Sequence, residues 1–385
     1  MIKTAQRLEQ TTEYYFSKKL KEVKQRIDDG KPIISLGIGS PDIQPPANVV
    51  QSMIKATNDD KAHQYQPYAG IKALREAISG FYQNTYRVNL DVDKNILPLM
   101  GSKEGIMHIS MAFVNPGDEV LIPNPGYPTY AAVARLVEAK TLYYDLDEKN
   151  NWQPDFDQLA KLVTPKTKVM WVNYPHMPTG AKADNEVLNQ LVKFTKQHNI
   201  LLVNDNPYSL ILNDKPHSIL ENAWPNQHVL ELNSLSKTFN LSGWRVGMLC
   251  GDKSLIESVV KVKSNMDSGM FYPIQKGGIT ALQSTAEWFE HLNGIYDKRR
   301  QLIWQLCDQL NLTYDKNTSG LFVWAKILTD ITSKALSDKL LNEYDMFVTP
   351  GDVFGSQGQG YVRFSLCIKS EDVKICLKRT KDFKA

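Results

Sequence analysis

Short runs of apolar residues, each bounded by turn-forming residues, recur through the middle of the chain. Strands buried on both faces of a sheet typically read as continuous apolar runs of this length. Two of the intervening segments, "TYAAVARLVEA" and "DNEVLNQLVKFTKQH", repeat apolar residues at helical spacing. Strands that alternate with helices predict an α/β fold with a mostly parallel sheet covered on both faces. The apolar runs are "EVLIPNP", "KTLYYDL", "KVMWVNY", "NILLVND", "HVLELNS" and "RVGMLCG".

The last quarter of the chain has a different pattern. A long helical pattern, "AEWFEHLNGIYDKRRQLIWQLCDQL", is followed by the apolar run "GLFVWAKI", a further helix and "GYVRFSLC". This order predicts a smaller α+β domain. Another helix is predicted over residues 14–27, and we expect it to join the smaller domain or to contact another subunit. Two domains also fit the length, because 385 residues exceed the size at which one core stops growing.

Composition and charge narrow the class of protein. The formal charge of +3 comes from 45 basic and 42 acidic residues spread along the chain, which argues against a dedicated nucleic-acid surface. No segment approaches the roughly 20 apolar residues of a membrane span, and the first residues lack the apolar core of a signal peptide. The four cysteines form no CxxC pair and the seven histidines show no metal-ligand spacing. We therefore expect a reduced cytoplasmic protein without a metal site.

Polar residues follow several predicted strands, at the edge where open parallel sheets bind ligands. Taken singly, each has a commoner structural role: an acid at a strand end usually caps a helix, and a lysine in a serine-rich loop is usually solvated. Together they are complementary. Backbone amides and an arginine suit a phosphate dianion, a carboxylate suits a protonated ring nitrogen, and a lysine can form a Schiff base. The candidates are Ser102, Lys103, Asp205, Tyr208, Ser234, Ser236, Lys237 and Arg245.

Seven motifs occur in a fixed order along the chain: "LGIGSPD", "YQPYAGIKALREAI", "NPGDEVLIPNPGYPTY", the "PTG" loop, "DNPY", "SLSKTFNLSGWRVG" and "VTPGDVFG…GYVRFSLC". This set resembles the class I/II aminotransferases of pyridoxal-phosphate fold type I, from about residue 30 to about residue 370. The first motif and the aromatic "EYYF" helix are similar to the branch with the LL-diaminopimelate and broad-specificity amino acid aminotransferases. The resemblance implies an N-terminal arm with part of the small domain over 1–44, a large domain that binds pyridoxal 5′-phosphate (PLP) over 45–285, and a C-terminal small domain over 286–385.

The resemblance also implies roles for the catalytic residues. Lys237 matches the lysine that forms a Schiff base with PLP and then moves the α-proton of the substrate. Asp205 matches the carboxylate that faces the pyridine nitrogen, which lets the ring accept an electron pair. Tyr208 matches the donor to the phenolate oxygen, and Tyr127 the aromatic ring that stacks on the cofactor.

The phosphate group is expected to be bound by five residues. The backbone amides of Ser102 and Lys103, the hydroxyls of Ser234 and Ser236, and the Arg245 guanidinium match the family's phosphate ligands.

Three further residues match binding groups of the family. Tyr65 corresponds to a tyrosine that reaches the phosphate from the neighbouring subunit, which implies a homodimer. Arg363 corresponds to the arginine that binds the substrate α-carboxylate, for which its planar fork is suited. Gly39 is expected to bring backbone close to that carboxylate.

The chain departs from the family at three positions. His176 and Met177 stand where two asparagines usually precede "PTG", and methionine cannot donate the second asparagine's hydrogen bond to the phenolate oxygen. Tyr68 stands where the diaminopimelate branch has an acidic residue that binds the distal amino group. An uncharged tyrosine favours a neutral, aromatic or sulfur-containing amino acid as donor. No arginine can be assigned to a side-chain carboxylate, so strict aspartate specificity is not expected.

We therefore expect a PLP-dependent aminotransferase that transfers an amino group from an amino acid to a 2-oxo acid. A PLP-dependent carbon–sulfur β-lyase is the alternative, because the same Lys237, Asp205 and Arg363 serve both reactions. A catalytically inactive PLP-binding regulatory domain is disfavoured, since these three residues are all present and no DNA-binding extension precedes the fold.

Overall fold

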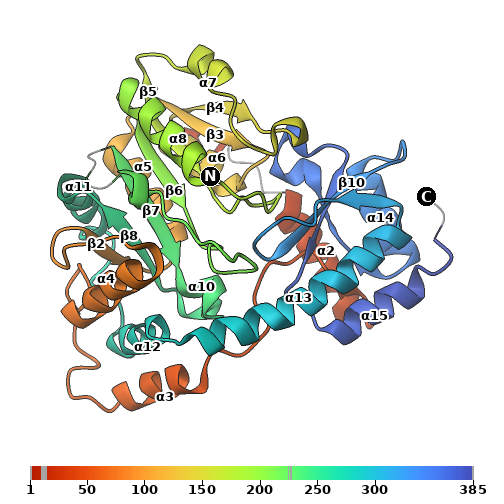
Figure 1. Ribbon diagram of the computed structural model, residues 1–385, viewed down its shortest axis with the longest axis horizontal. Helices are drawn as coiled ribbons and strands as arrows, with labels where there is room; N and C mark the ends of the chain where they lie inside the picture. The colour runs from red at the N-terminus through yellow and green to blue at the C-terminus, as the bar shows by residue number, and fades with distance from the viewer. Residues whose placement is uncertain (1, 10–14, 224, 226–227, 384–385) are drawn as a thin grey trace.

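Seven strands form one large sheet. The structure is a computed structural model that describes residues 2–9, 15–223, 225 and 228–383, and Figure 1 shows how its elements are arranged. All six apolar runs noted in the sequence form strands of this sheet. Six of its strands are mutually parallel, whereas β8 runs antiparallel to both of its neighbours. The predicted mostly parallel sheet is therefore confirmed. In spatial order the strands are β2 (Ile96–Leu99), β8 (Gly247–Gly251), β7 (Val229–Ser234), β6 (Leu201–Asp205), β5 (Thr167–Val172), β3 (Glu119–Asn124) and β4 (Lys140–Asp145).

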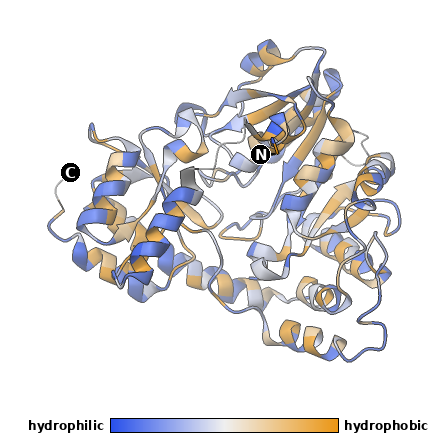
Figure 2. Ribbon diagram, turned by 180° about the vertical axis from the view of Figure 1, so that it is seen from behind, coloured by the Kyte–Doolittle hydropathy of each residue, from blue (hydrophilic) through white to orange (hydrophobic). Residues whose placement is uncertain are grey.

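Helices cover both faces of this sheet. Alternate residues of β5 enter different apolar clusters, with Val169 and Trp171 in one and Met170 and Val172 in the other. This alternation explains why the strands are apolar throughout, and Figure 2 shows much of the sheet in the hydrophobic colour. One cluster includes side chains of α4 (Lys72–Tyr86), α8 (Asn185–Gln197) and α12 (Tyr272–Leu282). The other includes side chains of α5 (Ser102–Phe113), α6 (Pro128–Leu136) and α11 (Lys253–Lys263).

The C-terminal part forms a second, antiparallel sheet with its own apolar cluster. The long helix α13 (Ala286–Gln309) leads into it from the larger part (Figure 1). Helices α14 (Ser333–Glu343) and α15 (Ser370–Arg379) pack here; α14 is the further helix that the sequence predicts, and α15 was not predicted. The strand order is β12 (Thr349–Pro350), β13 (Tyr361–Ser365), β10 (Phe322–Ile327) and β9 (Leu312–Tyr314).

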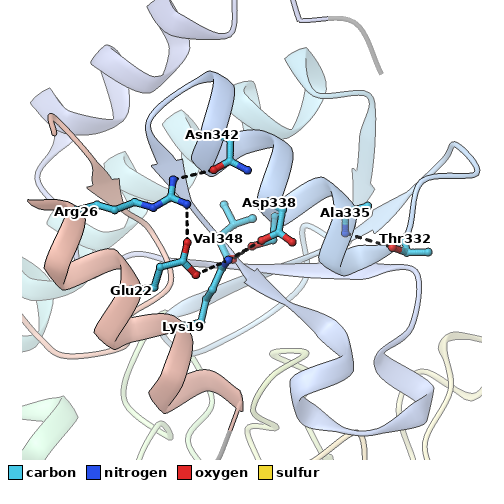
Figure 3. A network of polar contacts seen from close by, with 9 residues as sticks. Lys19, Glu22, Arg26, Thr332, Ala335, Asp338, Asn342 and Val348 are labelled. Atoms are coloured by element: carbon cyan, nitrogen blue, oxygen red, sulfur yellow. Dashed lines mark hydrogen bonds and ion pairs between the residues drawn. The ribbon is translucent and has the colours of Figure 1, made fainter.

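The N-terminal helix α2 (Tyr15–Asp28) packs against this C-terminal part; Tyr14, the first residue of the helix predicted from sequence, lies outside the described residues. Its buried Val23 shares an apolar cluster with Leu341 and Phe347. Polar contacts border that cluster (Figure 3): Lys19 Nζ lies 2.7 Å from an Asp338 carboxylate oxygen, and Arg26 donates to Asn342 at 2.7 Å. The following strand β1 (Ile34–Ser35) pairs in parallel with β11 (Met346–Phe347).

Shorter elements connect these parts. Residues 34–35 pair with the C-terminal part. The domain boundaries at residues 44 and 285 stay a prediction. Across the described residues, no helix is both long and apolar enough to cross a membrane. The remaining helices are α1 (Gln6–Glu9), α3 (Ala47–Ala56), α7 (Phe156–Leu162), α9 (Leu220–Ala223) and α10 (Leu235–Thr238), and the 3-10 turns are η1 (Glu148–Asn150), η2 (Ser242–Trp244), η3 (Gly351–Phe354) and η4 (Ser356–Gly358).

Candidate active site

A cavity of about 670 Å³ lies where the parallel strands of the large sheet end. Strands β2, β3, β5, β6 and β7 each deliver lining residues just beyond their carboxyl ends, and the antiparallel β8 begins at the same edge. Residues 322, 354 and 363 of the C-terminal part complete the wall. The structure thus brings together all but one of the residues predicted from sequence: Gly39, Ser102, Lys103, Tyr127, Asp205, Tyr208, Ser234, Ser236, Lys237, Arg245 and Arg363.

Asp205 is a buried carboxylate with one oxygen unsatisfied. Tyr130 donates to its Oδ2 at 2.9 Å, whereas Oδ1 is buried and has no hydrogen-bond partner among the described residues. Burial raises the pKa of Asp205 to about 6, against the opposing effect of the Tyr130 hydrogen bond. An unsatisfied buried acceptor is costly by itself, and it fits a cationic N–H group placed in the cavity.

Lys237 projects from the short helix α10 toward the segment that enters from the N-terminal part. Its Nζ donates to the Gly39 carbonyl oxygen at 2.6 Å. Burial lowers the pKa of Lys237, and the nearby Arg363 and Arg245 guanidinium groups act in the same direction. A lysine with a lowered pKa loses its proton more readily than a lysine in water. The neutral amine is the form that acts as a nucleophile or accepts a proton.

A cluster of donors surrounds the start of α5. Arg245 donates to the Ser236 hydroxyl at 3.4 Å and to the Ser242 carbonyl at 2.9 Å, and the Ser234 and Ser236 hydroxyls lie 2.9 Å apart. Gly101 precedes α5 with φ +86°, and a Cβ there would lie 2.1 Å from Arg245 Nη2. Glycine therefore permits the guanidinium to approach the helix N-terminus, an arrangement that suits a phosphate group.

Arg363 on β13 is held between two aromatic rings. Its guanidinium carbon lies 3.9 Å from the ring centre of Phe322 and 4.7 Å from that of Phe354. Nη2 donates to the Gly37 carbonyl at 2.8 Å, and Nη1 lies 3.2 Å from Met177 Sδ. A thioether is a weak acceptor, so an anion would be a stronger partner for Nη1 than Met177 is.

The "NYPHMPTG" loop divides its two unusual residues between different environments. Met177 lines the cavity, whereas His176 is buried inside the loop, with Nδ1 2.8 Å from Thr179 Oγ1. Burial lowers the pKa of His176 to about 3, which keeps the ring neutral. Asn173 bonds both the Asp205 carbonyl and the Met177 amide, and so ties this loop to β6. The family resemblance of the "PTG" loop places His176 near the site. Its side chain is buried within the loop and does not line the cavity.

Tyr65 is the predicted site residue that the structure does not bring to the cavity. Its side chain is 89% exposed and Tyr68 is 46% exposed. In a single chain, neither lies among the described residues of the lining.

Sequence reasoning missed several lining residues. Tyr130 lies in the quoted motif "NPGYPTY", and its ring stacks on Trp171 at 5.0 Å between centroids, but nothing local predicts its bond to Asp205. Asn173 follows a strand end, which was an available signal. Arg135, eight residues beyond Tyr127 on α6, also lines the cavity.

Two other features lie apart from this chemistry. A cavity of about 800 Å³ is lined by residues near 148–153, 179–187, 213–217 and 313–318 and contains none of the predicted site residues. Ligand atoms of Glu104, His108 and Asp267 lie within 4.8 Å of one another. Asp267 is paired with the buried Lys263 ammonium at 2.6 Å, which a metal ion would have to displace.

Comparison with known proteins agrees with the fold and the sequence motifs. The model of the family "Aminotransferase class I and II" matches residues 31–379. The LL-diaminopimelate aminotransferase of Aquifex aeolicus is 35% identical, with all of both chains covered. The substrate-bound BacF structure from Bacillus subtilis is 34% identical, with a TM-score of 0.95 and coverage of 99% of this chain and 98% of that one. The aromatic aminotransferase of Pyrococcus horikoshii is 30% identical, with a TM-score of 0.86 and coverage of 94% and 98%.

The residues of the cavity fit PLP, the cofactor of this family. Asp205 offers an unsatisfied buried oxygen for the ring nitrogen, and Arg245 with the Gly101 turn offers donors for the phosphate. The predicted fold type I architecture is confirmed by the family match and by the solved structures. The chain therefore belongs to the class I and II aminotransferases and is a PLP-dependent transaminase.

Proposed function

We propose that this enzyme moves an amino group from a neutral, aromatic or sulfur-containing amino acid to a 2-oxo acid. The observation that carries the proposal is the cavity wall next to Arg363, which consists of Phe322, Phe354 and Met177. Apolar walls favour an apolar substrate side chain. Asp205 is the only carboxylate among the described lining residues, so no second acid there pairs with a distal ammonium group.

Lys237 is the proposed proton carrier. When bound, PLP supplies a ring that accepts the electron pair left on the substrate carbon. Lys237 Nζ, whose pKa burial lowers, would accept the substrate's α-proton and later give it up again. Its bond to the Gly39 carbonyl holds Nζ at the substrate end of the cavity, because Gly39 lies on the segment that approaches Arg363 through Gly37.

Asp205 is proposed to keep the ring nitrogen protonated. The carboxylate must be ionised for this role, and the Tyr130 hydroxyl favours the ionised form against the effect of burial. Tyr208 is proposed to donate to the phenolate oxygen, since Met177 has no donor to give. Tyr127, at the start of α6, is proposed to stack on the ring.

The phosphate and the substrate carboxylate are proposed to bind at two different positively charged groups of the cavity, Arg245 and Arg363. The backbone amides of Ser102 and Lys103, the hydroxyls of Ser234 and Ser236, and Arg245 would bind the phosphate.

Arg363 would bind the α-carboxylate beside the Gly39 backbone. A Cβ on Gly39 would lie 2.4 Å from Phe322 Cζ, so this backbone reaches the ring that stacks on the guanidinium.

We further propose a homodimer in which Tyr65 reaches the partner's phosphate. Tyr65, Met266 and Phe271 are exposed apolar or aromatic side chains. Their segments are adjacent, because a Cβ on Gly269 would lie 2.2 Å from the Gln66 carbonyl oxygen. A patch of this kind favours contact with another protein surface. A solution mass equal to one chain would contradict the dimer.

LL-diaminopimelate is a second candidate donor, favoured by the names of relatives at about one-third identity over nearly the whole chain. A screen of amino donors against 2-oxoglutarate and pyruvate separates the two candidates. Turnover with aromatic or sulfur amino acids at least tenfold above that with LL-diaminopimelate supports the first, and the reverse order supports the second. Release of pyruvate and ammonia from a cysteine-like substrate without an acceptor would instead indicate a β-lyase.

Lys237→Ala tests the residue assignment. The variant is expected to lose turnover with every donor in the screen, while its fold, measured by circular dichroism, stays unchanged. Retained turnover would refute the role of Lys237.

A further inference from the structure

The turn before α5 begins a helix without a side-chain cap. Gly101 is the residue at which the helix starts, and its φ of +86° and ψ of 152° lie in a region that essentially only glycine adopts. Serine, threonine, asparagine or aspartate at this position would cap the first amides with a side-chain oxygen. Glycine has no such oxygen, so the amides of Ser102 and Lys103 are left for a ligand. The turn therefore needs support from a group that does not occupy these two amides.

Glu104 gives the turn this support. Its Oε2 accepts a hydrogen bond from the Met100 backbone amide at 2.5 Å. A glutamate at the third position of a helix often reaches back to the amide of the residue that starts the helix. Here the carboxylate reaches one residue further, to the amide that precedes Gly101. Ser102 and Lys103 line the cavity, whereas Glu104 is absent from its described lining, so the support comes from outside the cofactor space.

His108 fixes the orientation of the Glu104 carboxylate. It lies one turn further along α5, and its Nε2 is 2.9 Å from Glu104 Oε1. An ionised carboxylate can only accept, so the imidazole donates from Nε2. Each oxygen of Glu104 thus accepts one hydrogen bond, and the carboxylate cannot rotate without breaking one of them. The His108 side chain is buried, which keeps water from competing for its bond.

An ion pair at the end of α11 lies against the same group. One oxygen of Asp267 and the facing atoms of Glu104 and His108 all lie within 4.8 Å of one another. Lys263 Nζ is 2.6 Å from Asp267 Oδ2, and both side chains are buried. The lysine charge offsets the negative charge that Asp267 brings beside Glu104. Buried ion pairs contribute little net stability, but they do fix the relative positions of the groups that they join.

We propose that Glu104 is a positioning residue for the phosphate of PLP. Through the Met100 amide it holds the Gly101 turn, and with it the amides of Ser102 and Lys103, in the phosphate-binding conformation before the cofactor arrives. Donors that are already in place need no ordering by the ligand, so the phosphate binds more tightly. The inference rests on the proposed function in one respect, namely that the start of α5 binds the phosphate.

The test compares two aldehydes that differ only in the phosphate. PLP and pyridoxal are titrated into the cofactor-free full chain, and binding is followed by the absorbance of the bound aldehyde. The ratio of the two dissociation constants measures the contribution of the phosphate. The variants are Glu104→Ala, Glu104→Gln, His108→Leu and the double variant Glu104→Ala with His108→Leu.

Asp252→Ala is the matched control. Asp252 caps the start of α11 by accepting the Ser254 amide at 2.9 Å, and it is not among the described residues of the cavity lining. Its replacement therefore removes one carboxylate and one bond to a backbone amide at a helix start, as Glu104→Ala does, without touching the phosphate turn. The ratio of the two dissociation constants should stay at the wild-type value.

Glu104→Ala is expected to weaken PLP by roughly 10- to 100-fold and pyridoxal by less than about twofold, because the lost bond joins an amide to a charged group. Glu104→Gln retains an oxygen that can accept from Met100 and should recover most of the loss. His108→Leu should weaken PLP by a smaller factor. The double variant should match Glu104→Ala, because His108 acts only through Glu104.

Equal weakening of PLP and pyridoxal in Glu104→Ala would overturn the assignment, because a general loss of structure affects both. An unchanged ratio would overturn it too, as would a Glu104→Gln variant as weak as Glu104→Ala. His108→Leu releases the carboxylate without deleting it, so its ratio decides the question where Glu104→Ala does not fold, and a wild-type ratio there contradicts the proposal.

The wild type separates this inference from the proposed function. A wild type that binds PLP no more tightly than pyridoxal contradicts the proposed phosphate site, and the role of Glu104 with it. A wild type whose preference for PLP persists undiminished in Glu104→Ala contradicts only the role of Glu104.

Discussion

The hydroxyl of Tyr130 offers a direct way to perturb the acid that faces the cofactor ring. Tyr130→Phe removes the 2.9 Å bond to Asp205 Oδ2 and retains the ring that stacks on Trp171. Tyr144→Phe is the matched control, because Tyr144 is equally buried and its hydroxyl donates at 2.7 Å to the Trp171 carbonyl, outside the cavity.

The expected size of the effect follows from the strength of a hydrogen bond to a charged group. Such a bond contributes roughly 1.5–3 kcal/mol, which corresponds to about one to two pKa units. The pKa of Asp205, about 6 in the protein alone, should therefore rise to roughly 7 to 8. At pH 7 the ionised fraction would fall from about nine-tenths to between about one-half and one-tenth. Only the ionised form pairs with a protonated ring nitrogen, so PLP affinity should fall with it.

The assay is the pH dependence of PLP binding to cofactor-free enzyme, followed by the absorbance of the bound cofactor. The acid-side midpoint should move upward by about one to two pH units in Tyr130→Phe and stay in place in Tyr144→Phe. Titrations of the PLP phosphate and of Lys237 occur in both variants and cancel in the comparison. An unmoved midpoint in Tyr130→Phe, or the same shift in both variants, would refute the reasoning.

The raised pKa of Asp205 also predicts how the stability of the folded protein changes with pH. Its pKa is raised from 3.8 to about 6 in the folded protein, so the folded state binds this proton more tightly than the unfolded chain. The resulting stabilisation is fully present below the unfolded pKa and is lost as pH rises through about 6; it amounts to about 3 kcal/mol. Chemical unfolding of the cofactor-free protein at pH 4 and pH 7 measures it, with Asp205→Asn as the variant that should lack it.

Two further predictions concern single contacts. Gly101→Ala should lose roughly 1–3 kcal/mol of stability, because its φ of +86° is strained for alanine, and its Cβ should displace Arg245 and weaken PLP binding. Gly80→Ala, where nothing lies within 4 Å, is the helical control for thermal unfolding and should not destabilise. Met177→Asn should shift the pH titration of the bound cofactor's absorbance by restoring a donor; an identical titration would mean that Met177 does not contact the phenolate oxygen.

The sequence predicted the elements whose pattern is set by burial and the residues that belong to motifs. All six apolar runs are strands because both faces of the large sheet are covered, and Lys237, Asp205 and Arg363 meet at one cavity. The direction of β8 could not be predicted, since a buried strand has the same apolar pattern when parallel or antiparallel. Its reversal matters, because it places Arg245 at the ligand-binding edge.

Contacts between distant elements could not be predicted either. Arg135 lies in an ordinary helical pattern, and only the packing of α6 against the sheet turns it toward the cavity. The position of Met177 was known from its motif, but its contact with Arg363, 186 residues away, depends on how the two sheets are placed.

The pairing of α2 and β1 with the C-terminal part also constrains how the chain folds during synthesis. Residues 15–39 leave the ribosome well before the partners of Val23 and β1, which lie at residues 341–347. At about 5–20 residues per second, roughly 300 residues must be translated first, so the apolar face of α2 lacks its binding surface for roughly 15–60 s. The large sheet, complete by residue 251, can form in that interval. The cavity wall contributed by Gly39 and Arg363 is then assembled last, so the enzyme gains its substrate site only after residue 363 has emerged.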